Sequence, residues 1–98
     1  MMSTHIIGID PGKNGGVARV IFTDKYIWTA YKCPKNIKEM AELIKIFKKF
    51  AIKPKCFLEN VHAFPTDGRS SAFKFGTNFG MWQCILAALN IETELVTP

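Results

Sequence analysis

The sequence has little cysteine, and what it has forms no recognisable framework. Its 98 residues include three cysteines, Cys33, Cys56 and Cys84, which are widely spaced and odd in number. This arrangement is neither a disulfide framework nor a zinc-binding pattern. Cys56 and Cys84 lie in apolar runs, where a cysteine acts as a small buried hydrophobe, so we expect a reduced, cytoplasmic compartment.

Long apolar runs, signal-peptide patterns and lipidation motifs are also missing. We therefore expect a protein that is neither secreted nor bound to a membrane. Internal repeats and low-complexity segments are absent as well. With 48% hydrophobic and 21% charged residues, the composition is that of an ordinary folded protein, and the length predicts a single domain over residues 1–98.

Acidic residues are scarce relative to basic ones. Eight acids against 13 lysines and arginines give a formal charge of +5 at pH 7, and eight lysines lie between positions 32 and 55. Such an excess favours an anionic partner, of which nucleic acid is the commonest. The same excess occurs on lysine-rich surfaces that contact only water, so charge alone does not decide between the two.

The hydrophobic pattern predicts five strands and two helices. In chain order they are strands at 5–9, 17–22 and 26–31, a helix from its cap Asn36 to about Phe50, a strand at 56–58, a helix from Ser70 or Ser71 to about Leu89, and a strand at 92–96. Short turns join the first three strands into an antiparallel meander. Because a strand, a helix and a strand usually form a right-handed crossover, the fourth strand is expected parallel to the first. The order β-β-β-α-β-α-β predicts an α/β fold with a mixed sheet.

Two acids stand at the ends of predicted strands. Asp10 follows the first strand and opens a glycine-rich turn over 11–16, and Glu59 follows the fourth strand. The expected parallel pairing brings Glu59 beside Asp10. Magnesium takes carboxylate, water and phosphate oxygens as ligands, so such a pair suits metal-dependent phosphodiester chemistry. Alternatively, Asp10 only forms a turn and Glu59 only ends a strand in solvent.

Further candidate contacts to nucleic acid lie in the glycine-rich turn. Lys13 can contact a phosphate or be merely solvated, and Gly15 and Gly16 would let a phosphate approach main-chain N–H groups.

The second helix offers a basic and aromatic stretch. Arg69, Ser70 and Lys74, near its N-terminus, suit phosphate contacts through charge and free N–H groups. The three phenylalanines of this stretch either stack on bases or belong to the core; they are Phe73, Phe75 and Phe79. Gly76 and Gly80, four residues apart, permit a close backbone approach to the sheet or to a partner helix. The core or dimer contacts are assigned to Met81, Trp82, Ile85, Leu86 and Leu89.

The segments Gly8-Ile9-Asp10-Pro11-Gly12 and Leu58-Glu59-Asn60-Val61-His62 together resemble the RuvC-like Holliday-junction resolvases of the RNase H-like superfamily, particularly the phage versions. The resemblance implies a metal-dependent, structure-selective endonuclease of branched DNA that forms a homodimer, takes no small-molecule substrate and works in bacterial or phage-infected cytoplasm. It also implies that Asp10 and Glu59 are the catalytic residues and ligate Mg²⁺, or Mn²⁺ in its place.

The family also suggests roles for the loop after the fourth strand and for the helix beyond it. That loop carries an aromatic residue that reaches into the junction in family members, and Phe64 is the nearest candidate, although His62 stands closer to the family position. His62 is also a candidate general acid or base, or a DNA contact. Lys74 and Gly76 match a Lys-x-Gly stretch at the start of the family's helix.

The resemblance covers essentially the whole chain but only about the N-terminal two-thirds of a family member. Family members continue into further helices and end with an aspartate pair that completes a four-carboxylate site. The other acids of this chain are no obvious replacement for that pair. We therefore expect a truncated protein with an incomplete site, weak metal binding and little or no cleavage.

Two other functions stay open at this stage. Gly8-Ile9-Asp10-x-Gly12 also resembles the phosphate-binding opening of actin-like ATPases and sugar kinases, which are much longer proteins with two such domains. A non-catalytic nucleic-acid-binding module with the same fold is the other possibility.

Overall fold

The computed structural model describes residues 4–12, 14–60 and 68–97. Its elements are β1 (Thr4–Asp10), β2 (Gly16–Phe22), β3 (Tyr26–Lys32), α1 (Ile37–Lys49), β4 (Lys55–Glu59), α2 (Arg69–Ala88) and β5 (Glu92–Val96). The strands form one mixed sheet in the order β3-β2-β1-β4-β5. Strands β1 to β3 are antiparallel neighbours, whereas β4 runs parallel to β1 and β5 parallel to β4. The predicted fold class and element order are confirmed.

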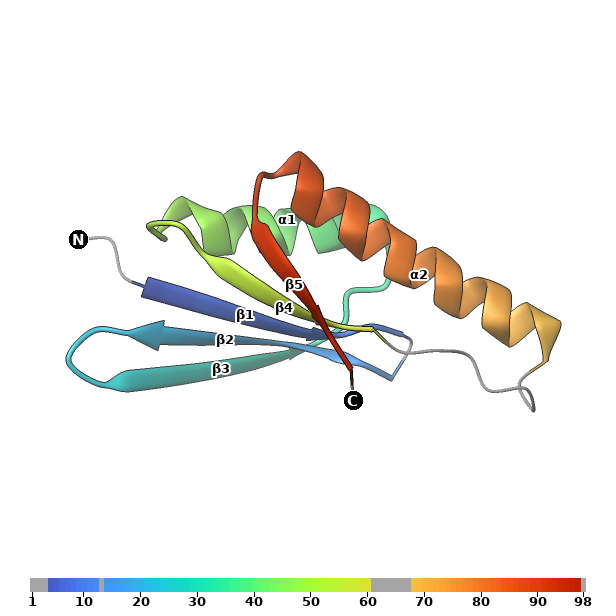
Figure 1. The fold of residues 1–98 in the computed structure, drawn as a ribbon, viewed down its shortest axis with the longest axis horizontal. Helices are drawn as coiled ribbons and strands as arrows, with labels where there is room; N and C mark the ends of the chain where they lie inside the picture. The colour runs from blue at the N-terminus through green and yellow to red at the C-terminus, as the bar shows by residue number, and fades with distance from the viewer. Residues whose placement is uncertain (1–3, 13, 61–67, 98) are drawn as a thin grey trace.

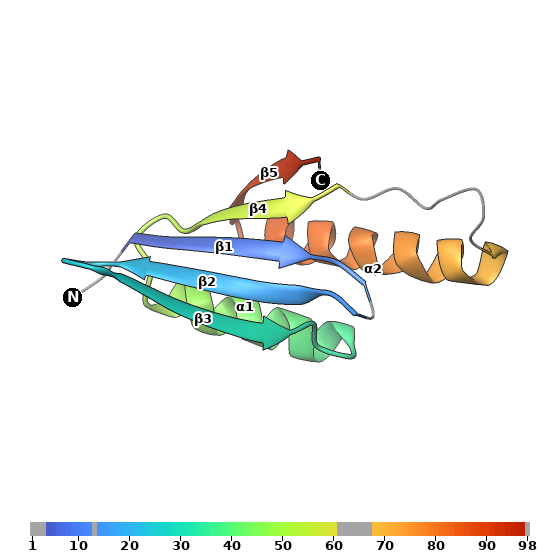
Figure 2. The same ribbon diagram turned by 90° about the horizontal axis from the view of Figure 1, so that it is seen from below.

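Both helices cover the same face of the sheet, as Figure 1 and Figure 2 show. Helix α1 starts where the sequence predicts, because the side chain of Asn36 accepts a hydrogen bond from the N–H of Glu39 at 2.9 Å. Its buried residues are Met40, Ile44 and Phe47. Ile37 and Phe50, at the two ends of the helix, are more than half exposed.

Helix α2 begins earlier than predicted. Gly68 is its N-cap and offers no side-chain cap. The predicted start at Ser70 or Ser71 is therefore wrong, and both serines lie inside the first turn. The predicted end of the helix at about Leu89 is confirmed: Leu89 is the C-cap, and Asn90 after it has a φ of +58° and donates its N–H to the carbonyl of Ala87. Neither α2 nor any other helix in the described ranges is long and apolar enough to cross a membrane.

The core fills the space between the helices and the sheet. It is formed by Ile7, Ile9, Val17, Met40, Ile44, Phe47, Cys56, Leu58, Trp82, Ile85, Leu86 and Ile91. Strands β1 and β4 alternate between buried and more exposed residues, the two-residue period expected of strands with one covered face. Cys84 is exposed, so its expected burial is wrong. It lies on α2 between Trp82 and Ile85 in sequence but turns away from the face that they bury.

The opposite face of the sheet is open. Four large side chains on this face, Ile6, Val20, Tyr26 and Trp28, line an apolar hollow of about 360 Å³ together with two small residues, Gly8 and Ala18. Trp28 is 72% exposed and Tyr26 67%. Asp10 follows Gly8 by two residues along β1, so its side chain belongs to this same open face.

The burial pattern predicts a large difference between two phenylalanines near the end of α1. Phe47 is fully buried, its ring lying 5.6 Å from that of Tyr31 and 4.7 Å from the Arg19 guanidinium, whereas Phe50 is 56% exposed. We expect Phe47→Ala to lower the free energy of unfolding by about 3–5 kcal/mol. The control Phe50→Ala should change it by only about 0.5 kcal/mol. Urea denaturation measures both, and equal losses would contradict this packing.

Candidate functional site

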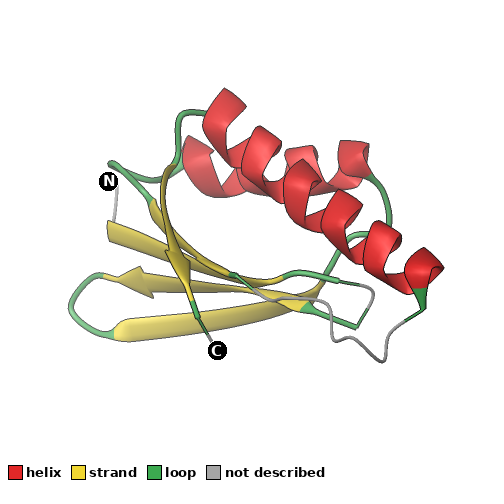
Figure 3. Cartoon of the chain, turned by 45° about the vertical axis from the view of Figure 1, so that its right-hand side comes forward, coloured by secondary structure: helices red, strands yellow, loops and turns green. Residues whose placement is uncertain are grey.

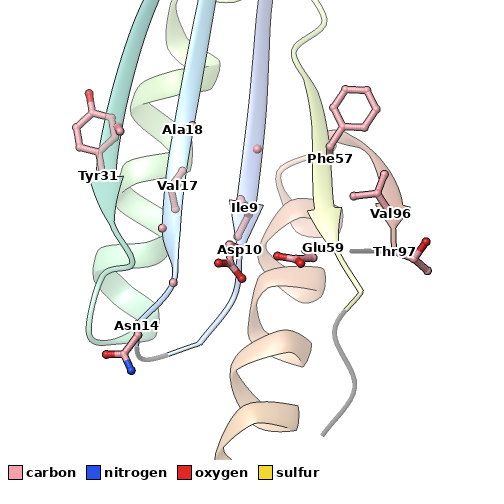
Figure 4. A pocket seen from close by; sticks show the side chains of 14 residues that line it. Ile9, Asp10, Asn14, Val17, Ala18, Tyr31, Phe57, Glu59, Val96 and Thr97 are labelled. Carbon is pink, nitrogen blue, oxygen red and sulfur yellow. The ribbon is translucent and has the colours of Figure 1, made fainter. Parts of the chain in front are cut away.

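The pairing of β1 with β4 brings the two predicted acids together. Ile7 lies opposite Cys56 and Ile9 opposite Leu58, so the residues that follow, Asp10 and Glu59, end neighbouring strands at one edge of the sheet. Figure 4 shows the two carboxylates side by side. The juxtaposition predicted from the sequence is therefore present, and the catalytic and metal-binding roles of the pair stay predictions.

A cleft of about 700 Å³ opens beside the pair. Part of its lining consists of residues with little or no side chain, which leave the space open: Gly8, Gly15, Gly16, Ala18 and Ala30. Tyr31 and Phe57 stand on its walls, and Asn14 and Thr97 at its rim (Figure 4). Asp10 and Glu59 thus line a cleft that is large enough to take a bound ligand.

Asp10 changes the titration of Glu59. A side-chain hydrogen bond with Asp10 raises the pKa of Glu59 above its usual range, and partial desolvation and the negative charge of Asp10 act in the same direction. The hydrogen bond stabilises the protonated form of Glu59, and the nearby negative charge of Asp10 adds to this effect. A bound cation would offset that negative charge, and the oxygen donors of the pair suit a hard divalent ion.

The turn after Asp10 is held by its own backbone. The N–H of Gly15 donates to the carbonyl of Gly12 at 3.1 Å, and a Cβ at position 15 would fall 1.9 Å from the carbonyl oxygen of Asp10. Glycine is therefore required at 15 by packing. The expected phosphate contact through the N–H of Gly15 is not supported, because this donor is already used within the turn.

Cys33 contributes to the same turn, a role that sequence reasoning missed. Its thiol donates to the carbonyl of Asp10 at 3.3 Å, and its N–H donates to the carbonyl of Gly15 at 3.2 Å. Burial, and then the charge of Asp10, raise the pKa of the Cys33 thiol. The sulfur therefore stays protonated at neutral pH and acts as a donor that steadies the backbone of Asp10.

The remaining predicted contacts lie apart from the cleft or outside the described residues. Arg69, Ser70 and Lys74 are exposed on the first turns of α2 and do not line the cleft. These turns project past the edge of the sheet at which β1 and β4 end (Figure 2). Lys13, His62 and Phe64 lie outside the residues that the structure describes.

Sequence reasoning also missed Asn78. Its Oδ1 accepts a hydrogen bond from the N–H of Gly12 at 2.9 Å, across 66 positions of the chain. The available signal was its residue type, since asparagine is disfavoured inside helices unless its side chain has a partner. By contrast, a Cβ at Gly76 or Gly80 would meet nothing within 4 Å, so neither glycine serves a close approach to another described residue.

No third ligand joins the pair in the described part of the chain. Among these residues there is no group of three or more histidine, cysteine, aspartate or glutamate side chains that could hold a metal ion. The described residues thus supply two carboxylates to any metal site at this edge.

The interaction of Glu59 with Asp10 predicts how the pKa of Glu59 responds to mutation of Asp10. Asp10→Asn removes the charge of Asp10 and the carboxyl partner of Glu59, so we expect the pKa of Glu59 to fall toward its ordinary range. Side-chain NMR titration of Glu59 measures this. The control Asp24→Asn, an exposed acid in the β2–β3 turn, should leave the pKa of Glu59 unchanged.

The same shift sets a pH dependence of stability. Because folding raises the pKa of Glu59, the folded state binds this proton more tightly than the unfolded state does. The resulting stabilisation is present at acid pH and is lost as the pH rises through the folded-state pKa of Glu59. Asp10→Asn should therefore remove this part of the pH dependence of stability. Denaturation curves measured over a series of pH values test this, and the same pH dependence in Asp10→Asn and in the unmodified protein would contradict the interaction of Glu59 with Asp10.

Comparison with known proteins finds similarity in structure and none in sequence. No family model matches the chain, and no curated protein matches it. A solved structure described as Thermus thermophilus RuvC in complex with a Holliday junction substrate matches with a TM-score of 0.61 and 16% identity, over 97% of this chain and 65% of that one. Another Thermus thermophilus RuvC structure matches with a TM-score of 0.59 and 18% identity, over 97% and 64%. The chain thus spans about 65% of the length of these structures and has the RuvC-like, RNase H-like fold.

Proposed function

We propose that this chain carries part of the active site of a metal-dependent nuclease that acts on branched DNA. The observation that carries the proposal is the pair of carboxylates, Asp10 and Glu59, at the ends of adjacent parallel strands in a RuvC-like fold. The solved RuvC that is bound to a Holliday junction supports branched DNA as the substrate class.

The residues present fit a divalent cation. Asp10 and Glu59 offer oxygen donors, stand side by side and open onto a cleft (Figure 4). The hydrogen bond with Asp10 and the negative charge of Asp10 raise the pKa of Glu59, so the two carboxyl groups are close enough to share one cation. Magnesium, or manganese in its place, would supply activation of a water molecule and neutralisation of charge on the phosphate. Because Glu59 must lose its proton to bind metal, affinity should increase as the pH rises through its pKa.

Two carboxylates hold a catalytic metal weakly. A two-ion site for phosphodiester hydrolysis would need more oxygen ligands than Asp10 and Glu59 supply. We infer that further ligands come from outside the described residues or from a partner chain, and a homodimer is the arrangement that the family resemblance predicts. The pair alone should give weak metal binding and slow cleavage.

The first turns of α2 are the proposed contact with the DNA backbone. Arg69, Ser70 and Lys74 are exposed there, and Phe73 is 76% exposed beside them. Charged and hydroxyl side chains at a projecting helix end suit phosphate contacts, which position a protein on DNA without reading its sequence. The formal charge of +5 adds a general attraction to DNA.

The shortage of described ligands favours one rival. Because the described residues bring only two carboxylates within reach of each other, the fold and the basic surface would also serve a non-catalytic module that binds branched DNA. The phenotype of such a module would not depend on Asp10 or Glu59, whereas the phenotype of the nuclease would.

A cleavage assay on a four-way DNA junction with magnesium tests the proposal. We expect slow junction-selective cutting that both Asp10→Asn and Glu59→Gln abolish, because each removes a metal ligand, while Asp24→Asn leaves it unchanged. A linear duplex is the substrate control, and binding in the presence of a chelator shows that the variants still recognise the junction. Junction binding without cleavage in magnesium or manganese would support the non-catalytic module, and the absence of junction binding would contradict both functions.

The exposed basic residues of α2 give a separate prediction. Arg69→Ala and Lys74→Ala should each weaken junction binding and lower the slope of its salt dependence by about one, because each removes one side chain that neutralises a phosphate. Lys25→Ala is the matched control, since Lys25 lies in the β2–β3 turn at the other end of the sheet. Titrations at several salt concentrations measure the slope, and an equal effect of Lys25→Ala would indicate nonspecific attraction only.

A further inference from the structure

One side-chain contact ties α2 to the turn that follows the first acid. The Oδ1 of Asn78 accepts the N–H of Gly12 at 2.9 Å in a partly buried setting. Asn78 belongs to α2, and Gly12 stands two residues after Asp10. The contact therefore acts on the backbone that leads directly away from one of the two carboxylates.

A second residue of α2 reinforces this contact. The ring of Phe75 lies so near Gly12 that a Cβ there would be 3.3 Å from its Cε2 atom. Phe75 and Asn78 are three residues apart in a helix, so they share one face and meet the same turn. Both Gly12 and Pro11 before it are buried, and the two helical side chains account for part of that burial.

The conformation that they hold is an unusual one. Gly12 has a φ of +115°, which side-chain-bearing residues rarely adopt. Its N–H is taken by Asn78 and its carbonyl by the N–H of Gly15 at 3.1 Å. Because both its N–H and its carbonyl are hydrogen-bonded, Gly12 is held in this conformation, and the path of the backbone after Asp10 is fixed.

The turn is thus connected to the N-terminal end of α2 through a rigid element. Lys74 lies one helical turn before Asn78, and the exposed Phe73 precedes it. In Figure 2 these early turns of α2 extend past the edge where β1 and β4 end. Helix α2 therefore connects a group bound at its N-terminal end to the Asp10 carboxylate, through the contact of Asn78 with Gly12.

We propose that Asn78, supported by Phe75, is a positioning residue that fixes the Asp10 carboxylate through Gly12 and couples it to the DNA-contacting end of α2. This inference rests on the proposed function for its DNA and metal partners, whereas the contact with Gly12 does not. Asn78 touches neither metal nor substrate in this role and acts only through the turn.

The test compares three variants. Asn78→Ala removes the acceptor, and Asn78→Asp keeps an acceptor of the same size. Thr77→Ala is the matched control, because among the described residues the Thr77 hydroxyl donates to the carbonyl of Phe73 in its own helix and not to the turn. Hydrogen exchange of the Gly12 amide, followed by NMR, should become about two- to tenfold faster in Asn78→Ala, the factor that corresponds to the removal of one hydrogen bond. It should stay unchanged in Thr77→Ala and be largely preserved in Asn78→Asp.

Manganese binding supplies the second readout. Paramagnetic broadening of the Asp10 and Glu59 resonances gives an apparent Kd, which Asn78→Ala should weaken about tenfold, as the removal of an outer-shell partner typically does. Metal-free junction binding and the melting temperature of Asn78→Ala should stay near those of Thr77→Ala. A general loss of structure would instead lower both of these together with the affinity for manganese.

The outcomes separate the coupling from the proposed function. Unaltered Gly12 exchange in Asn78→Ala, or equal weakening of manganese binding in Thr77→Ala, would overturn the positioning role. No manganese broadening at Asp10 and Glu59 in the unmodified protein would instead overturn the metal site, and the exchange of Gly12 would still decide whether Asn78 holds the turn. If Asn78→Ala does not fold, Asn78→Ser takes its place as the variant with a shortened side chain, and Asn78→Asp remains the variant that keeps the acceptor.

Discussion

The parallel pairing of β1 with β4 is the constraint on which the rest of the structure depends. It aligns residues 6–9 with 55–58, and α1 supplies the crossover that parallel strands need. Because side chains alternate along a strand, a slip of one residue would turn Glu59 toward the helices and Leu58 toward solvent. One register therefore fixes both the apolar core and the meeting of Asp10 with Glu59.

The same alternation divides the sheet into two unlike faces. One face packs against α1 and α2, and the other carries the apolar hollow with Trp28 and Tyr26 exposed at its side. Antiparallel sheets can leave one face to solvent, but a large exposed apolar patch on a protein usually marks an interaction surface. The acids lie at one end of this open face, so whatever covered it would also border the carboxylate pair.

Local signals in the sequence were enough to predict the fold and the acid pair. Asn36 caps α1 and Asn90 ends α2 by interactions within a few residues, and such interactions are written in the residue types themselves. The start of α2 was missed because Gly68 caps it without a side chain. The roles of Gly15 and Asn78 were missed because both depend on partners that only the folded chain brings close.

The hydrogen bonds of the glycine-rich turn distinguish two uses of such a segment. A turn that cradles phosphate, as in the actin-like ATPases, must keep its main-chain N–H groups free for the ligand. Here the N–H of Gly12 is bonded to Asn78 and that of Gly15 to the carbonyl of Gly12. Both donors are used to shape the backbone around Asp10. The described part of the turn is therefore built to hold a carboxylate in place, and this favours a cation as the partner of the site over a phosphate held by the backbone.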